Sequence, residues 1–281
     1  MAKGMFVDTS ICIGCKACQV ACKEWNNLAG TPSRFETVDN SLKAVNFTGD
    51  SYDNTANMSA YDWRRVRFIE AIPPDRSSGA WYMMSDSCKH CVQAGCLNVC
   101  PTHALTRTDL GNVVVQQDVC NGCRDCIAAC PFGVISYNHE TGIAAKCTLC
   151  DDRIHAGLET ACAKVCPTGS IKFGEVSELR AEAAQRVAAL QQAGFAKAQI
   201  YGDEKILGGL NVFYLLLDDP EEYGQPRAPQ LPQKNLIPGS LASIGTAIVL
   251  GLSALVAFRE RGTKGGRSSN GNGQESTREE A

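Results

Sequence analysis

Sixteen cysteines occur in four groups of four, and their spacing indicates the chemistry of the chain. The groups are Cys12-x2-Cys15-x2-Cys18-x3-Cys22, Cys88-x2-Cys91-x4-Cys96-x3-Cys100, Cys120-x2-Cys123-x2-Cys126-x3-Cys130 and Cys147-x2-Cys150-x11-Cys162-x3-Cys166. In the run C-x2-C-x2-C-x3-C-P, three thiolates bind one [4Fe–4S] cube and the fourth binds a neighbouring cube. Sixteen thiolates at four per cube predict four [4Fe–4S] clusters, and therefore a protein that carries electrons.

Three other uses of cysteine fit this pattern less well. Disulfides stabilise small secreted domains, but this chain has 281 residues and its C-x2-C-x2-C repeats are not a bridge framework. Zinc binds paired C-x2-C motifs, and residues 147–166 taken alone resemble such a site. Zinc does not explain the evenly spaced cysteines of the first and third groups. Buried free cysteines would not repeat at fixed spacing.

Spacing leaves two pairings of the groups open. The second and third groups are separated by residues 101–119, a gap that suits one ferredoxin-like unit and leaves the first and fourth groups to pair around it. Pairing of the first group with the second, and of the third with the fourth, is also compatible, because Cys130 and Cys147 are close in sequence.

The residues between the cysteines resemble a known family. The runs are CIGCKACQVAC (12–22) followed by EWN (24–26), CIAACPF (126–132), KCTLCDDR (146–153) and CPTG (166–169). They are similar to the iron–sulfur β subunit of membrane-bound formate dehydrogenases and, more broadly, to the four-cluster subunits that accompany molybdopterin oxidoreductases. The likeness extends from about Phe6 to Gly174 and resumes near the C-terminus. One departure is Lys23, which replaces the proline after the fourth cysteine; since that proline closes a local turn, we expect ligation to be unaffected.

The resemblance implies a nested pairing, in which the fourth cysteines are exchanged between groups. Four ligand sets follow: set A is Cys12, Cys15, Cys18 and Cys166; set B is Cys147, Cys150, Cys162 and Cys22; set C is Cys88, Cys91, Cys96 and Cys130; set D is Cys120, Cys123, Cys126 and Cys100. Every position is cysteine, so four complete [4Fe–4S] clusters are expected.

The expected fold is α+β, with two interleaved ferredoxin-like 2[4Fe–4S] units and one C-terminal transmembrane helix. The predicted parts are an outer unit of residues 1–87 with 139–175, including an insertion at 23–87; an inner unit at 88–138; a packing segment at 176–219; a proline-rich linker at 220–235; the transmembrane helix at 236–258; and a disordered cytoplasmic tail at 259–281.

Local patterns add several elements outside the cysteine groups. Short strands are expected at 63–70, 112–115 and 171–173, and a buried strand at 211–217. Residues 177–193 predict an amphipathic helix. Ser177 would cap this helix and Gly194 would end it, and its apolar stripe would be Leu179, Ala183, Val187 and Leu190.

Some polar and aromatic residues allow a functional interpretation beside a structural one. Arg64, Arg65 and Arg67 are interpreted as a solvated strand face rather than as a patch that binds a partner's carboxylates. Trp25 is interpreted as a packed core residue or as a neighbour of a cluster. His90 lies inside the second group, but complete cysteine sets make it unnecessary as a ligand.

The C-terminal region predicts a membrane anchor. Residues 235–258 carry no charge, and about 20 apolar residues span a bilayer. The small residues Gly239, Ser243, Ala247 and Gly251 recur at intervals of four and suggest a membrane partner.

The flanking charges predict the orientation of this anchor. Arg259, Arg261, Lys264 and Arg267 outnumber Lys234, which places the C-terminus in the cytoplasm and the cluster domain on the extracytoplasmic (periplasmic) side. The N-terminus shows no signal peptide, so the domain is expected to cross the membrane folded. The resemblance implies that it does so with a partner that bears a twin-arginine signal.

The composition favours no nucleic-acid partner, since the net charge is −3. No phosphate loop, triad or paired-carboxylate motif occurs, so we expect no catalysis by this chain itself. The resemblance implies an electron-transfer subunit that takes electrons from a molybdopterin (Mo or W) catalytic subunit and passes them to a membrane cytochrome b and quinone. The alternatives are the equivalent subunit of a sulfur-compound or S-oxide reductase, a membrane-tethered polyferredoxin, and an iron–sulfur sensor.

Overall fold

The computed structural model describes residues 2–30, 34–38, 41–45, 57–72, 75, 79–232 and 236–265. The chain divides into two compact units, Met1–Leu231 and Pro232–Ala281, which are described separately. The first unit contains all sixteen cysteines.

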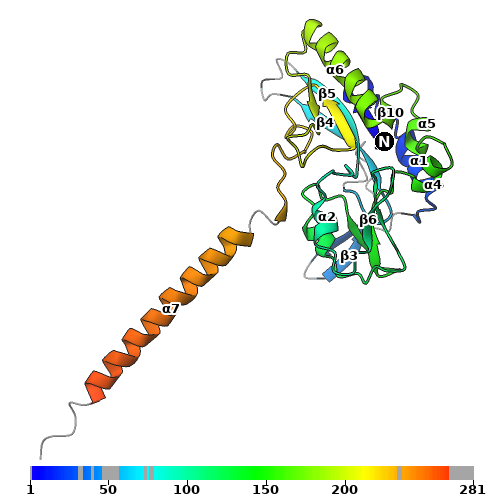
Figure 1. The fold of residues 1–281 in the computed structure, drawn as a ribbon. Coiled ribbons are helices and arrows are strands. Elements are labelled where there is room, and N and C mark those ends of the chain that lie inside the picture. Colours follow the sequence, from blue (N-terminus) through cyan, green and yellow to red (C-terminus); the bar gives the residue numbers. More distant parts are fainter. Residues whose placement is uncertain are drawn as a thin grey trace, which may run out of the picture. The chain divides into compact units, whose positions relative to one another are not determined.

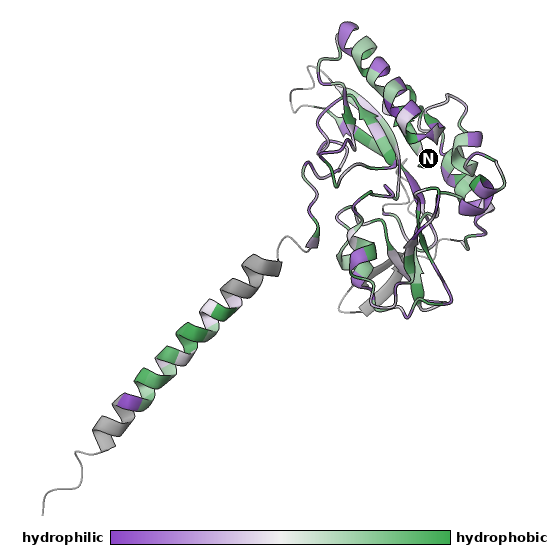
Figure 2. Ribbon diagram, in the orientation of Figure 1, coloured by the Kyte–Doolittle hydropathy of each residue, from purple (hydrophilic) through white to green (hydrophobic). Residues whose placement is uncertain are grey.

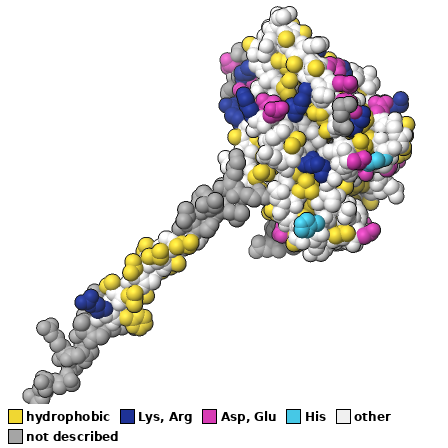
Figure 3. All heavy atoms as spheres, viewed as in Figure 1, with side chains coloured by type: hydrophobic (Ala, Val, Ile, Leu, Met, Phe, Trp, Pro, Cys, Tyr) yellow, Lys and Arg dark blue, Asp and Glu magenta, His cyan; other side chains and the backbone are white. Residues whose placement is uncertain are grey.

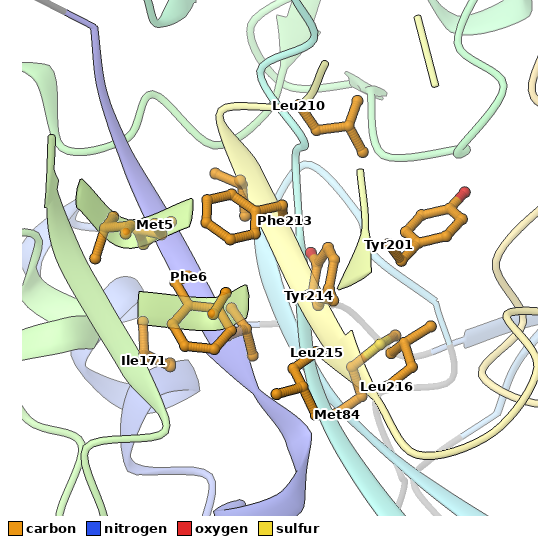
Figure 4. Close-up of a cluster of buried hydrophobic side chains, with 14 of the residues drawn as sticks. Met5, Phe6, Met84, Ile171, Tyr201, Leu210, Phe213, Tyr214, Leu215 and Leu216 are labelled. Atoms are coloured by element: carbon orange, nitrogen blue, oxygen red, sulfur yellow. The ribbon is translucent and has the colours of Figure 1, made fainter. Parts of the chain in front are cut away.

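A four-stranded sheet forms the centre of the first unit. Its strand order is β10 (Ile171–Glu175), β1 (Lys3–Asp8), β12 (Val212–Leu216) and β11 (Gln199–Tyr201). The strand β1 pairs antiparallel with β10 and parallel with β12. Every residue of β12 is buried, as its continuous apolar run predicts, and the ring of Phe213 stacks on that of Phe6 at 5.5 Å (Figure 4).

The helix α6 (Val176–Gln192) packs against β1 and β10 (Figure 1). Leu179, Ala183 and Leu190 are buried, so the predicted apolar stripe faces the core. The predicted cap is wrong: Ser177 already lies inside the helix, and Glu175 occupies the N-cap position without a side-chain cap. The reason is that β10 runs directly into α6, and the backbone N–H of Val176 donates to the carbonyl of Ala2 instead.

The cysteines lie on short helices and, for the most part, in the loops beside them, and two-stranded ribbons occur between these segments. The ribbons are β2 (Arg34–Val38) with β3 (Ser41–Val45), β4 (Arg64–Ala71) with β5 (Ala80–Ser87), β6 (Leu105–Arg107) with β7 (Val113–Val115), and β8 (Ser136–Asn138) with β9 (Ile143–Ala145). The helices are η1 (Thr9–Ile11), α1 (Ala17–Trp25), α2 (Gly95–Asn98), α3 (Asp125–Ala128), α4 (Asp151–His155) and α5 (Ala161–Lys164). The strands predicted at 63–70, 112–115, 171–173 and 211–217 are confirmed as β4, β7, β10 and β12.

Part of the predicted linker packs on the first unit. Tyr223 is fully buried, and its ring stacks on that of Tyr82 at 5.2 Å. Gln225 is also buried and donates to the carboxylate of Asp86. Pro220, Tyr223 and Gln225 are therefore packed into the first unit, whereas residues 221, 222 and 224 are exposed.

The second unit contains the helix α7 (Leu236–Gly265), drawn largely in the colour of hydrophobic residues in Figure 2. The helix begins at the predicted residue and extends past residue 258, so residues 259–265 are helical rather than part of a disordered tail. The rest of that predicted tail, 266–281, lies outside the described residues. Within the described residues, no helix combines the length and the apolar character that a membrane span requires.

Candidate iron–sulfur cluster sites

The four cysteines of set A line one hollow. Cys12 and Cys15 lie in the loop after η1, Cys18 lies on α1, and Cys166 follows α5; all four border the same cavity, together with Ser85 and Thr168. The four cysteines of set C likewise line one hollow, with Lys89, His90 and Phe132. In both hollows three ligands come from one group and the fourth comes from another group, as the nested pairing expects.

Sets B and D are brought together in the same way. Burial raises the pKa of Cys22 well above its usual value, and its neighbours Cys147, Cys162 and Cys150 raise it further. Burial raises the pKa of Cys126 to about 11, and Cys123, Cys120 and Cys100 contribute to the same shift. Each of these two thiols therefore has the other three members of its predicted set as neighbours.

A left-handed residue precedes the second cysteine of every group. These residues are Gly14 (φ 68°), His90 (φ 45°), Gly122 (φ 71°) and Leu149 (φ 62°). Non-glycine residues rarely adopt positive φ, so the strain at His90 and Leu149 marks a turn that the surroundings impose. The turn reverses the backbone between cysteines and directs their sulfur atoms to the same side.

The turn after the fourth cysteine is shared by three groups. Three residues beyond Cys100, Cys130 and Cys166, the residues His103, Gly133 and Gly169 have positive φ, and their N–H groups donate to the carbonyls of those cysteines at 3.2–3.3 Å. The first group, which lacks the proline, continues instead as α1 up to Trp25. The missing proline thus changes the local backbone, and Cys22 still neighbours the other three cysteines of set B. That its ligation is unaffected stays a prediction.

Replacing Gly122 with alanine should disturb set D. A Cβ atom there would lie 2.2 Å from the backbone carbonyl oxygen of Gly142, and φ is +71°. We expect a cost larger than the roughly 1–2 kcal/mol of left-handed strain alone, together with loss of iron from this set. The matched control is Gly133→Ala, at which φ is +61° but no atom lies within 4 Å of the added Cβ. Equal thermal stability and iron content in the two variants would contradict this expectation.

The chemistry of the cysteines fits a metal cluster. Burial raises the pKa of Cys18 and of Cys150 to about 11 and that of Cys147 to about 12, so these thiols would stay protonated at neutral pH. Thiolates are the ligating form, and bound metal would replace those protons. A single ion would need three or more ligands that converge on one point, and none of the described residues do so; the cysteines surround hollows instead.

Three buried cations lie near the cysteine sets. Arg64, Lys89 and Lys146 are each at most 2% exposed. The ammonium group of Lys89 pairs with Asp86, donates to the carbonyl of Ser87 at 3.0 Å and lies 5.3 Å from the ring centre of Phe132. Lys146 donates to the carbonyls of Val113 and Cys147. The sequence interpretation of Arg64 as a solvated residue is wrong, because it lies on the inward face of β4.

His90 is a structural residue of the second group. Its Nδ1 accepts the N–H of Val113 at 3.0 Å, so the proton of the neutral ring lies on Nε2. Burial lowers the pKa of His90 well below its usual value, and the charge on Lys146 adds to this effect. The neutral ring fixes β7 beside set C.

Trp25 is not a core residue, so the first of the two sequence interpretations is wrong; its place beside a cluster stays a prediction. Its side chain is 44% exposed, and Nε1 donates to the carboxylate of Asp152 at 2.9 Å. The guanidinium of Arg153 lies 4.2 Å from its ring centre. Trp25 therefore attaches the end of α1 to α4.

Neighbouring cysteines connect set A with set B, set B with set C, and set C with set D. Cys18 of set A neighbours Cys162 of set B, and Cys147 of set B neighbours Cys88 of set C. Cys96 of set C in turn neighbours Cys126 of set D. The two exposed cysteines, Cys15 and Cys123, belong to the first and last sets, whereas all four cysteines of set B are buried.

This arrangement defines a class of protein in which paired iron–sulfur units share one polypeptide. Two family models with the description 4Fe-4S dicluster domain match residues 11–104 and 79–176. Together with the sixteen cysteines, these two dicluster matches account for four [4Fe–4S] clusters in an α+β protein.

Relatives of known name identify the family more closely. The formate dehydrogenase iron-sulfur subunit of Haemophilus influenzae is 42% identical over 229 residues, which cover 80% of this chain and 69% of the relative. The iron-sulfur subunit of the nitrate-inducible formate dehydrogenase of Escherichia coli is 40% identical over 246 residues, or 86% of this chain and 78% of the relative. The B subunit of the anaerobic dimethyl sulfoxide reductase of E. coli is 34% identical over 205 residues, which cover 70% of this chain and 86% of the relative. This protein belongs to the family of formate dehydrogenase iron–sulfur subunits.

Proposed function

We propose that this chain carries electrons within a formate dehydrogenase complex and has no catalytic site of its own. The membership of its family and the four sets of cysteines together support this function. Each [4Fe–4S] cluster, when bound, takes up and releases one electron. Sets A, B, C and D are the proposed ligands of these clusters, in two interleaved ferredoxin-like units.

The chain conducts from one exposed end to the other. Cys15 and Cys123, at the two ends of the series of sets, are exposed, and the buried set B lies in its interior. Set B, whose four cysteines are all buried, keeps the interior of the path away from water. One end receives electrons from a molybdopterin (Mo or W) subunit that oxidises formate, and the other delivers them to a membrane cytochrome b and then to quinone.

The second unit anchors the complex to the membrane in this proposal. Residues 235–258 carry no charge, and from Leu236 onward they lie in α7, on which Leu255 and Phe258 are 67% and 72% exposed. Figure 3 shows hydrophobic side chains along this helix up to a basic residue, whereas acidic and basic side chains mix on the visible face of the first unit. The proposed orientation has the C-terminus in the cytoplasm and the cluster unit outside, and the four cations of residues 259–267 support it.

Activity and composition of the native complex test the proposal. Purified through this chain, the complex should reduce an artificial dye with formate and should show haem b absorbance. Haem and clusters without formate activity would favour the reductase alternative, and the absence of both partners would favour a polyferredoxin.

A reporter fused to the C-terminus should be active in the cytoplasm, and activity only outside the cell would contradict the orientation.

A further inference from the structure

Arg64 is a buried cation held in a fixed position between two ligand sets. It begins β4 and is 1% exposed. One guanidinium nitrogen donates to the hydroxyl of Ser85 at 2.9 Å, and the other donates to Ser87 at 3.0 Å and lies 3.6 Å from the sulfur of Met5. Its Nε is buried and, among the described residues, has no hydrogen-bond partner.

The charge of Arg64 is not balanced by a carboxylate. Among the described residues no Asp or Glu forms an ion pair with it, although a guanidinium remains charged even when buried. Burial would lower the pKa of Arg64, but the thiolates of Cys162, Cys18, Cys147 and Cys22 raise it above its ordinary value. An uncompensated buried charge is strongly destabilising. Ligating cysteines are thiolates, so with clusters bound these four cysteines, one from set A and three from set B, would supply the counter-charge of Arg64.

Single bridging residues connect the guanidinium to each set. The hydroxyl of Ser85, which accepts from Arg64, lies 3.1 Å from the sulfur of Cys18. A ligating thiolate carries no proton, so with a cluster bound the hydroxyl of Ser85 would donate to that sulfur. The sulfur of Met5, in contact with Arg64, lies 3.6 Å from the sulfur of Cys162. The hydroxyl of Thr160 lies 3.4 Å from the sulfur of Cys162 and is a further polar neighbour of this cysteine.

We propose that Arg64 is a positioning residue whose fixed positive charge is shared by the clusters of sets A and B and makes both of them easier to reduce. The inference rests on the proposed ligand sets. An added electron makes a cluster more negative, so a nearby cation stabilises the reduced form. Hydrogen bonds to cluster sulfur act in the same direction, and here Ser85 adds one to set A. Because one charge serves both sets, its removal should shift both reduction potentials in the same direction.

Redox titration of the full chain, purified anaerobically in detergent and followed by electron paramagnetic resonance, tests the proposal. In Arg64→Met, the equilibrium constants for reduction of clusters A and B should each fall at least about tenfold, which is about 59 mV for a one-electron couple. Clusters C and D should be unchanged. Cys15→Ala and Cys150→Ala preparations assign the signals of A and B. The matched control is Arg65→Met, the next residue of the same strand, on its other face.

Two further variants keep the test decisive if Arg64→Met binds iron poorly. Arg64→Lys keeps the charge and should recover most of both potentials. Ser85→Ala keeps the charge but removes the hydroxyl, and should shift cluster A alone. Unchanged potentials in Arg64→Met, equal shifts of all four clusters, or an Arg64→Lys shift as large as that of Arg64→Met would overturn the proposal. A wild-type protein without four clusters would instead contradict the proposed ligand sets.

Discussion

Replacing Cys150 with alanine is expected to stop formate-driven reduction of quinone by the complex. Cys150 belongs to set B, which lies between sets A and C and is buried throughout. Loss of one thiolate removes a ligand on which metal binding depends, and the path is then interrupted in its interior. Quinone reduction should fall to the level of a preparation that lacks this chain, whereas formate-driven reduction of a dye by the catalytic subunit should persist.

The control for this prediction is Lys164→Gln. Lys164 lies on α5, the helix that carries Cys162, and its side chain is 71% exposed, so both activities should be retained. Iron analysis of Cys150→Ala should show that the other three clusters remain. Quinone reduction at the wild-type rate by a variant that lacks cluster B would show that the four sets do not form one path.

Replacing Asp86 with alanine is expected to destabilise the first unit severely. The buried carboxylate accepts from Lys89, from Arg67 at 3.1 Å, from the hydroxyl of Tyr214 at 3.2 Å and from Gln225 at 3.1 Å. Removing it leaves the ammonium of Lys89 buried without its partner, and breaking such a pair costs about 3–5 kcal/mol. Since metal loss makes unfolding irreversible, the rate of cluster bleaching at fixed temperature is the appropriate measurement.

The contribution of Asp86 should depend on pH. Burial alone would raise its pKa, but Lys89 and Arg67 outweigh burial and hold the pKa below its usual value. A carboxyl with a lowered folded pKa stabilises the fold above its unfolded value of about 3.9, and the contribution is lost as pH falls through the folded pKa. Asp86→Asn should therefore bleach faster than wild type at pH 7 and approach it in acid. Asp109→Asn is the control, since that side chain is 75% exposed; equal bleaching by both variants at pH 7 would contradict this account.

The conventional elements were predictable because their signals are local. The apolar run of 211–217 predicts a buried strand, and the stripe from Leu179 to Leu190 predicts α6. The position of the N-cap of α6 was not predictable, since it depends on how directly β10 leads into the helix. The burial of Tyr223 and Gln225 was hidden by the surrounding prolines, which suggest a spacer.

In the candidate site, too, some features were predictable from local sequence and others were not. Spacing predicts clusters because thiolates at two-residue intervals have few other uses, but it left the pairing of the groups open. The neighbours of Cys22 and Cys126 arise from contacts between distant segments, which spacing does not encode. Arg64 was misjudged because an arginine on an alternating strand normally faces water; only a cluster of thiolates beneath it makes the inward face favourable. Which sets are neighbours in space is likewise determined by the fold and not by the spacing of the cysteines.

Iron and labile sulfide, measured per full-length chain after anaerobic purification, test the central claim most directly. Four [4Fe–4S] clusters on sixteen cysteines predict about sixteen iron and about sixteen sulfide per chain. Zinc in place of iron, or half of this iron and sulfide in a fully folded protein, would contradict the account of four clusters that form one electron path.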